Sequence, residues 1–200
     1  MLSAYVLGIE NVLCLTGDHV SLGDHPQAKP VFDLDSVSLL LTAKELEQGR
    51  DLAGKELMGA PNFCLGAVVP PGADPIEPQI IKMEKKVKAG AQFFQTQAVY
   101  EPEKFKEFMK AVAYLNVPVL VGIVLLKSAA MARFMNKNVA GVYVPDDLIE
   151  EMDGAENRAQ KSIEIAARLI KEMKPLCQGV HIMAIGWENK VPEVLDAAGL

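Results

Sequence analysis

Residues 117–126 have the sequence Val-Pro-Val-Leu-Val-Gly-Ile-Val-Leu-Leu, an almost unbroken apolar run of strand length. A strand with one face in water alternates apolar and polar residues, whereas a strand covered on both faces does not need to alternate. The run is too short to cross a membrane, which takes about 20 apolar residues. It therefore predicts a strand buried on both faces, as in a parallel sheet covered by helices.

Four more apolar runs lie along the chain, and segments with helical periodicity separate them. The runs are residues 11–16, 63–69, 92–97 and 180–187, and the helical segments are residues 36–48, 80–90, 105–112, 129–135 and 156–174, with a last helix that closes at Leu200. Asp33 or Asp35 is the expected cap of the first of these helices, and residues 141–145 are expected to form a short extended piece. Five β-α units predict an α/β protein. Because no linker or internal repeat interrupts them, we expect one domain over residues 1–200.

Residues 3–8 and the number of β-α units limit the choice of α/β fold. Residues 3–8 have the character of the end of a helix that leads into the first strand, with Gly8 as its stop signal. Five β-α units can form a small open sheet, but a (β/α)8 barrel needs eight units and about 250 residues. The chain is therefore expected to be either a small open sheet or the last five-eighths of a barrel.

The composition excludes several broad classes of protein. The 200 residues are 50% hydrophobic and 23% charged, and the formal net charge is −6. A negative chain has no general affinity for nucleic acid or an anionic membrane, although a local basic patch can still bind phosphates. No stretch has the length of a transmembrane helix, and the apolar start lacks the basic leader of a signal peptide. These features predict a cytoplasmic protein.

The cysteines and histidines give no sign of a metal site. The three cysteines are odd in number, widely spaced and set among apolar residues, which predicts buried thiols in a reducing compartment: Cys14, Cys64 and Cys177. His19 and His25 have no third ligand at a recognisable metal spacing. His181 begins an apolar strand and is expected to be a core histidine. We therefore expect no metal.

Polar residues follow the first apolar run, where the carboxyl end of a parallel strand would meet a ligand. Thr16, Gly17 and Asp18 come directly after that run. Gly17 allows a tight turn or a close approach to a ligand. Asp18 is either a carboxylate that faces a cofactor or a residue that caps its own loop.

Two glutamines end the third run. Gln95 and Gln97 are two residues apart, so they point to the same face of a strand. A buried amide without a partner costs about 1–3 kcal/mol, and a bound heterocycle with its own donors and acceptors would satisfy both side chains. A structural network with neighbouring strand ends is the alternative explanation.

A run of lysines lies on the helix that follows the second apolar run: Lys82, Lys85, Lys86 and Lys88. Such a run forms either a solvated helix face or a site for the phosphates of a cofactor, because ammonium groups act as point charges for phosphate.

Four segments, in this order, resemble the methylenetetrahydrofolate reductase family. They are Asn-Val-Leu-Cys-Leu-Thr-Gly-Asp at 11–18, Gly-Ala at 66–67 with Pro-Gly-Ala-Asp-Pro at 71–75, Ala-Gly-Ala-Gln-Phe-Phe-Gln-Thr-Gln at 89–97, and Leu-Lys-Ser-Ala at 126–129 with Ala-Arg-Phe-Met at 132–135. The resemblance extends over essentially all 200 residues. It implies a parallel α/β barrel of the TIM type, of which this chain is similar to strands four to eight.

The resemblance also implies a chemistry. The family uses FAD to reduce 5,10-methylenetetrahydrofolate to 5-methyltetrahydrofolate, a step of one-carbon metabolism that supplies methionine. Asp18 matches the family's aspartate near the flavin ring and the pterin, and Gln97 matches the glutamine that hydrogen-bonds the pterin, with Gln95 beside it. Gly17, Lys85 and Lys86 match family residues that contact FAD. Thr16 and Lys82 stand at family contact positions with a different residue type, and both, together with Asp18, are also expected to contact FAD.

Some features depart from the family pattern. Many members have an arginine where this chain has Thr16, and Asn-Pro where it has Val69-Pro70. No strand corresponds to the one that carries the family's general acid, a glutamate. We therefore expect a partial chain that self-associates or is completed by a partner, with NAD(P)H or a protein such as a ferredoxin as electron donor. The alternatives are a non-catalytic flavin- or folate-binding subunit and a folate-dependent methyltransferase barrel.

Overall fold

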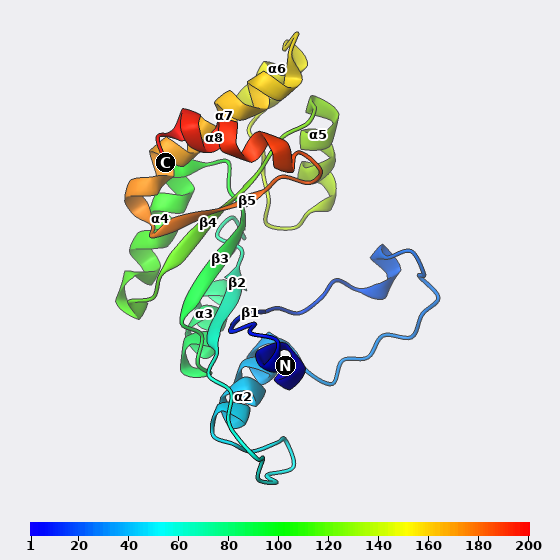
Figure 1. Cartoon of the computed structure of the whole chain (residues 1–200). Coiled ribbons are helices and arrows are strands. Elements are labelled where there is room, and N and C mark those ends of the chain that lie inside the picture. The colour runs from blue at the N-terminus through cyan, green and yellow to red at the C-terminus, as the bar shows by residue number, and fades with distance from the viewer. The chain divides into compact units, whose positions relative to one another are not determined.

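The structure is a computed structural model that describes the backbone of residues 1–200 and every side chain except that of Leu22. It shows an α/β protein in which five strands follow the chain order β1-β2-β3-β4-β5 in a parallel sheet (Figure 1). The strands are β1 (Asn11–Cys14), β2 (Cys64–Val69), β3 (Phe93–Ala98), β4 (Val119–Val124) and β5 (Gly179–Met183). The predicted parallel α/β class and all five strands are thus confirmed, each strand within about two residues at its start. The correspondence to strands four to eight of a barrel stays a prediction.

Helices separate the strands. They are α1 (Leu2–Val6), α2 (Ser36–Glu47), α3 (Glu77–Lys88), α4 (Pro102–Val112), α5 (Ala129–Asn138), α6 (Asp146–Asp153), α7 (Arg158–Met173) and α8 (Val191–Ala198). Short 3-10 turns occur at η1 (Val20–Leu22), η2 (Ala113–Leu115), η3 (Lys174–Leu176) and η4 (Glu188–Lys190). Helix α6 was not predicted from the sequence, although Pro145 precedes it and two aspartates lie in its first turn. The positive end of a helix stabilises such negative side chains.

The chain divides into two compact units. The first comprises Met1–Val68 with Lys82–Phe93, and the second comprises Val69–Ile81 with Phe94–Leu200. The prediction of one domain over residues 1–200 stays a prediction.

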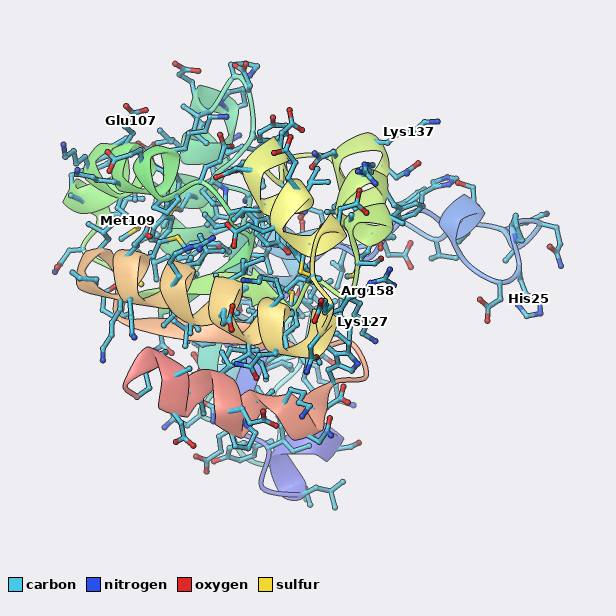
Figure 2. All side chains as sticks on the ribbon, turned by 90° about the horizontal axis from the view of Figure 1, so that it is seen from above. His25, Glu107, Met109, Lys127, Lys137 and Arg158 are labelled. Carbon is cyan, nitrogen blue, oxygen red and sulfur yellow. The ribbon has the colours of Figure 1, made fainter. Side chains whose placement is uncertain are left out.

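In the first unit, α2 packs on β1, and β1 pairs with β2 in parallel from Asn11 beside Cys64. Asp35 is the cap of α2, since its Oδ1 accepts a hydrogen bond from the Ser38 backbone N–H at 2.8 Å. Gly8 follows α1 with φ +83°, as its predicted role of stop signal requires. Between β1 and α2 the chain forms a long, largely exposed loop, and Figure 2 shows His25 on its outer part.

In the second unit, β4 lies between β3 and β5. Five of the six residues of β4 are buried, which confirms that this strand is covered on both faces. Helix α7 packs on β4 and also contacts α4, α6 and α8, and Figures 1 and 2 show α7 and α8 side by side. The inward face of α7 follows the helical period, with buried residues at Ile163, Ala166, Ala167 and Ile170.

The cysteines differ in part from their expected burial. Cys14 is buried and Cys177 is half-buried, and burial raises the pKa of both thiols. The prediction is wrong for Cys64, which is exposed. Cys64 is the first residue of β2, and its side chain points away from the face that buries Leu65 and Ala67. An apolar sequence neighbourhood therefore does not guarantee burial at a strand terminus.

Two further expectations need correction. His181 is half-buried rather than in the core, and burial lowers the pKa of its imidazole. Residues 141–145 form no strand. Among the described residues, no helix is both long enough and apolar enough to span a membrane.

Candidate functional site

The two glutamines of β3 share one face of the strand, as their spacing predicts. Gln95 and Gln97 are half-buried, whereas the alternate residues Phe94, Thr96 and Ala98 are buried on the opposite side. This alternation is the two-residue period of a strand. It places both amides together at the carboxyl end of β3, where parallel α/β folds bind their ligands.

The pairing of β3 with β4 is irregular next to Gln97. Gln95 lies beside Leu120, but the next registered pair joins Ala98 to Gly122, so β3 has one residue more than β4 over this stretch. The buried hydroxyl of Thr96 lies at this point. It accepts a hydrogen bond from the Gly122 backbone N–H at 2.8 Å and donates one to the Gln97 carbonyl oxygen at 2.6 Å. An extra residue of this kind is a β-bulge, which redirects side chains.

The side-chain oxygen of Gln97 is buried and accepts no hydrogen bond from any described residue. It lies next to Gly141, where an added Cβ would come within 3.1 Å of this oxygen and 3.3 Å of the Cβ of Pro70. Gly141 has φ +78°, a conformation that favours glycine. A side chain at position 141 would therefore crowd the Gln97 oxygen and Pro70, and glycine avoids this contact.

The loop that contains Gly141 is fixed by a side chain of α5. The Asn136 amide nitrogen donates to the Val144 carbonyl oxygen at 2.8 Å, and its amide oxygen accepts from the Val144 N–H at 2.7 Å. On the other side of Gly141, its carbonyl oxygen would lie 2.5 Å from a Cβ added to Gly72. Asn136 therefore fixes the loop, and the lack of a Cβ at Gly72 lets the loop lie close to the turn after β2. Neither residue was predicted to have this role, because a contact between two distant loops leaves no local pattern in the sequence.

The predicted site residues of the first unit lie on and beside the long loop after β1. Thr16 joins the loop to α2, because its hydroxyl oxygen accepts a hydrogen bond from the Ser36 backbone N–H at 3.1 Å. Asp18 is exposed. A Cβ added to Gly17 would meet no atom within 4 Å, so the fold of this chain does not itself require glycine there.

The lysines of α3 differ from one another in their surroundings. Lys82 and Lys85 are exposed, but Lys86 is half-buried and its ammonium donates to the Val68 carbonyl oxygen of β2 at 2.6 Å. Burial lowers the pKa of Lys86, and the charge of Lys82 lowers it further. A solvated helix face therefore describes Lys82 and Lys85 but not Lys86.

Lys82 and Lys86 lie near the start of α2, where Asp35 caps the helix. Hydrogen bonds from Ser38 lower the pKa of Asp35, and the charge of Lys82 contributes to the same effect. The cluster thus combines two ammonium groups with one carboxylate at a helix N-terminus, which carries a partial positive charge. Its net positive charge can attract an anionic group. In the part of the chain that the structure describes, no group of three or more His, Cys, Asp or Glu side chains could hold a metal ion.

The fold is shared with a solved structure. The chain superimposes with a TM-score of 0.53 and 18% sequence identity, over 78% of this chain and 68% of that one, on a protein described as "Uncharacterized protein from Clostridium thermocellum binds two copies of 5-methyl-5,6,7,8-tetrahydrofolic acid". At this identity the likeness shows a common α/β fold.

The sequence comparison identifies the family. The family model described as "Methylenetetrahydrofolate reductase" matches residues 1–199. The chain belongs to the methylenetetrahydrofolate reductase family.

Two curated relatives come from Schizosaccharomyces pombe. "Methylenetetrahydrofolate reductase 2" is 28% identical over 219 aligned residues that cover 96% of this chain. "Methylenetetrahydrofolate reductase 1" is 25% identical over 213 residues that cover 98% of it. The alignments cover 32% of each relative, so the chain spans about a third of their length.

Proposed function

We propose that this chain forms the folate- and flavin-binding part of an enzyme that reduces 5,10-methylenetetrahydrofolate to 5-methyltetrahydrofolate, in the one-carbon metabolism that supplies methionine. Membership of the reductase family supports the reaction class. The observation that carries the proposal is the buried, unpartnered amide oxygen of Gln97 at the carboxyl end of β3.

Gln97 is suited to a pterin, because an amide both donates and accepts hydrogen bonds and the edge of a pterin ring offers both kinds of partner. In this proposal the Gln97 oxygen, which lacks a partner within the chain, accepts a hydrogen bond from the ring. Gln95 supplies a second amide on the same face of β3. The structural neighbour, whose title says that it binds 5-methyl-5,6,7,8-tetrahydrofolic acid, supports a folate as the ligand class.

The positive cluster of the first unit fits the phosphates of FAD. Lys86 is held by one hydrogen bond to Val68 and keeps two further N–H donors. In this proposal Lys82, Lys85 and Lys86 contact the phosphates, while Thr16 and Gly17 form the part of the loop that approaches the flavin. FAD, when bound, supplies the hydride transfer that amino-acid side chains cannot perform.

Asp18 is proposed as the carboxylate that adjusts flavin reduction and helps to orient the pterin, because it follows β1 at the carboxyl end of a parallel strand.

Opening the folate ring also requires a proton on a folate nitrogen, and general-acid catalysis contributes about 10²–10⁴-fold. We propose that the five strands correspond to strands four to eight of a (β/α)8 barrel, and that a further segment or partner chain in the cytoplasm contributes the acid. NAD(P)H or an electron-transfer protein would be the donor.

The test begins with the visible spectrum of the 200-residue chain after FAD is added and the protein is desalted. We expect retained flavin absorption, and addition of 5-methyltetrahydrofolate to perturb it. The chain is then mixed with a fragment that supplies the remaining strands of the barrel, and folate-dependent oxidation of the reduced flavin is measured.

The outcomes separate the candidate functions. Flavin retention with folate-dependent oxidation in the completed protein supports the reductase. Retention of both ligands without oxidation indicates a non-catalytic binding subunit, and folate binding without flavin in the completed protein indicates a methyltransferase type. A protein that binds neither ligand after completion contradicts the proposal.

A further inference from the structure

The irregularity in β3 lies directly beside the amide that the proposed function uses. The ladder with β4 pairs Gln95 and then Ala98, and it steps over the two residues between them. It resumes beyond the bulge, where the Val99 N–H donates to the Gly122 carbonyl oxygen at 2.9 Å. Gln97 therefore occupies the bulge itself, and its direction depends on what holds the bulge in place.

The bulge in β3 is held by the Thr96 hydroxyl and by the close approach of β4 at Gly122. The Thr96 hydroxyl accepts from the Gly122 N–H and donates to the Gln97 carbonyl, so it takes the place that a backbone carbonyl would have in a regular ladder. Gly122 is the second feature, because a Cβ there would lie 2.5 Å from the Thr96 carbonyl oxygen and 2.7 Å from the Gln97 carbonyl oxygen. Only glycine lets the strands come this close.

We propose that Thr96 is a positioning residue for folate binding, which acts by holding the bulge so that the Gln97 amide oxygen faces Gly141. This inference rests on the proposed function of Gln97. Thr96 is buried on the opposite side of β3 from Gln95, so it acts through the backbone. Without the hydroxyl, the Gly122 N–H loses its acceptor and the Gln97 carbonyl loses its donor, and β3 is free to return to a regular register. The direction of the Gln97 side chain relative to Gly141 is then no longer fixed by the bulge.

The experiment compares Thr96→Val, which keeps the shape but removes both hydrogen bonds, with Thr96→Ser, which keeps the hydroxyl. Affinity for 5-methyltetrahydrofolate is measured by calorimetry on the full chain, completed as above where binding requires it. We expect Thr96→Val to weaken binding about tenfold, the size of one or two net hydrogen bonds, and Thr96→Ser to stay within about twofold of wild type. In a Gln97→Ala background, Thr96→Val should cause no further loss, because the residue through which it acts is gone.

The results separate this inference from the proposed function. The positioning role would be overturned if Thr96→Val bound 5-methyltetrahydrofolate as tightly as wild type. It would also be overturned if Thr96→Val lost the same affinity in the wild-type and Gln97→Ala backgrounds. Neither result would contradict the proposed folate binding itself. If the wild-type protein binds no 5-methyltetrahydrofolate, the proposed function fails, and the inference is then judged by the NMR resonances of the Gln97 side-chain amide. A shift of these resonances in Thr96→Val but not in Thr96→Ser supports the positioning role, and unchanged resonances in both refute it.

Discussion

The carboxyl end of β3 and the region beside the loop after β1 are built in different ways. At the end of β3, the polar atoms around Gln97 are set by buried contacts: the Thr96 hydroxyl, the Gly122 backbone and the loop that Asn136 fixes. Beside the loop, Asp18 and two of the lysines are exposed, and a single hydrogen bond ties Thr16 to α2.

In the proposed function, this difference predicts two kinds of ligand recognition. A site whose groups are already fixed loses little conformational entropy on binding and selects its ligand by geometry. A site made of long cationic side chains and an open loop attracts its ligand by charge and becomes ordered around it. We therefore expect substitutions at the end of β3 to act through shape, and substitutions in the lysine cluster to act through charge.

The largest effect on stability is expected from a substitution of Gly122, and the matched control is the same substitution at Gly17. Gly122→Ala would place a Cβ against two carbonyl oxygens, whereas Gly17→Ala would meet open space. We expect the free energy of unfolding to fall by about 1–3 kcal/mol for Gly122→Ala and to change little for Gly17→Ala. Urea unfolding of both variants checks this, and equal stability of the two would remove the tight bulge from the account.

A smaller effect, on FAD affinity, is expected from substitutions of the α3 lysines Lys82, Lys85 and Lys86. Lys86→Met removes a half-buried ammonium that lies beside Lys82, and Lys85→Met removes an exposed one. FAD should bind about tenfold more weakly to Lys86→Met, and less than threefold more weakly to Lys85→Met, because exposed charges are screened. Titration of the flavin absorbance at two salt concentrations tests this. Equal losses, insensitive to salt, would argue against a phosphate site.

The smallest effect concerns pH. Burial lowers the pKa of His181, so the folded protein binds its proton less readily than the unfolded chain does. As the pH falls from about 7.5 to about 5, the unfolded state takes up more protons and stability decreases. The loss should be below about 1 kcal/mol, because the side chain is only half-buried and solvent screens it. His181→Gln should reduce the slope of the unfolding free energy against pH over this range. An unchanged slope would mean that other groups cause the pH dependence.

Local patterns predict part of this molecule. The apolar runs predict the strands, and the spacing of Gln95 and Gln97 predicts their common face, because both follow from the two-residue period of a strand. The bulge cannot be predicted in this way. It depends on a hydroxyl of β3 that meets an N–H of β4, and a single sequence contains no signal for that pairing.

Other parts of the site depend on tertiary contacts in the same way. Asn136 fixes a loop eight residues further along the chain, and the character of Lys86 comes from a carbonyl of β2 rather than from its own helix. Cys64 illustrates the opposite error, since its apolar neighbours suggest a burial that its place at the start of β2 does not provide.

The measurement that most directly tests the central claim compares 5-methyltetrahydrofolate binding by the wild-type protein and by Gln97→Ala, with FAD affinity measured on the same samples. Removing the amide should weaken folate binding at least about tenfold, the usual size for loss of a buried hydrogen-bonding partner, while FAD affinity stays the same. Equal folate affinity in the two proteins would contradict the account, because the buried oxygen of Gln97 would then have no part in ligand recognition.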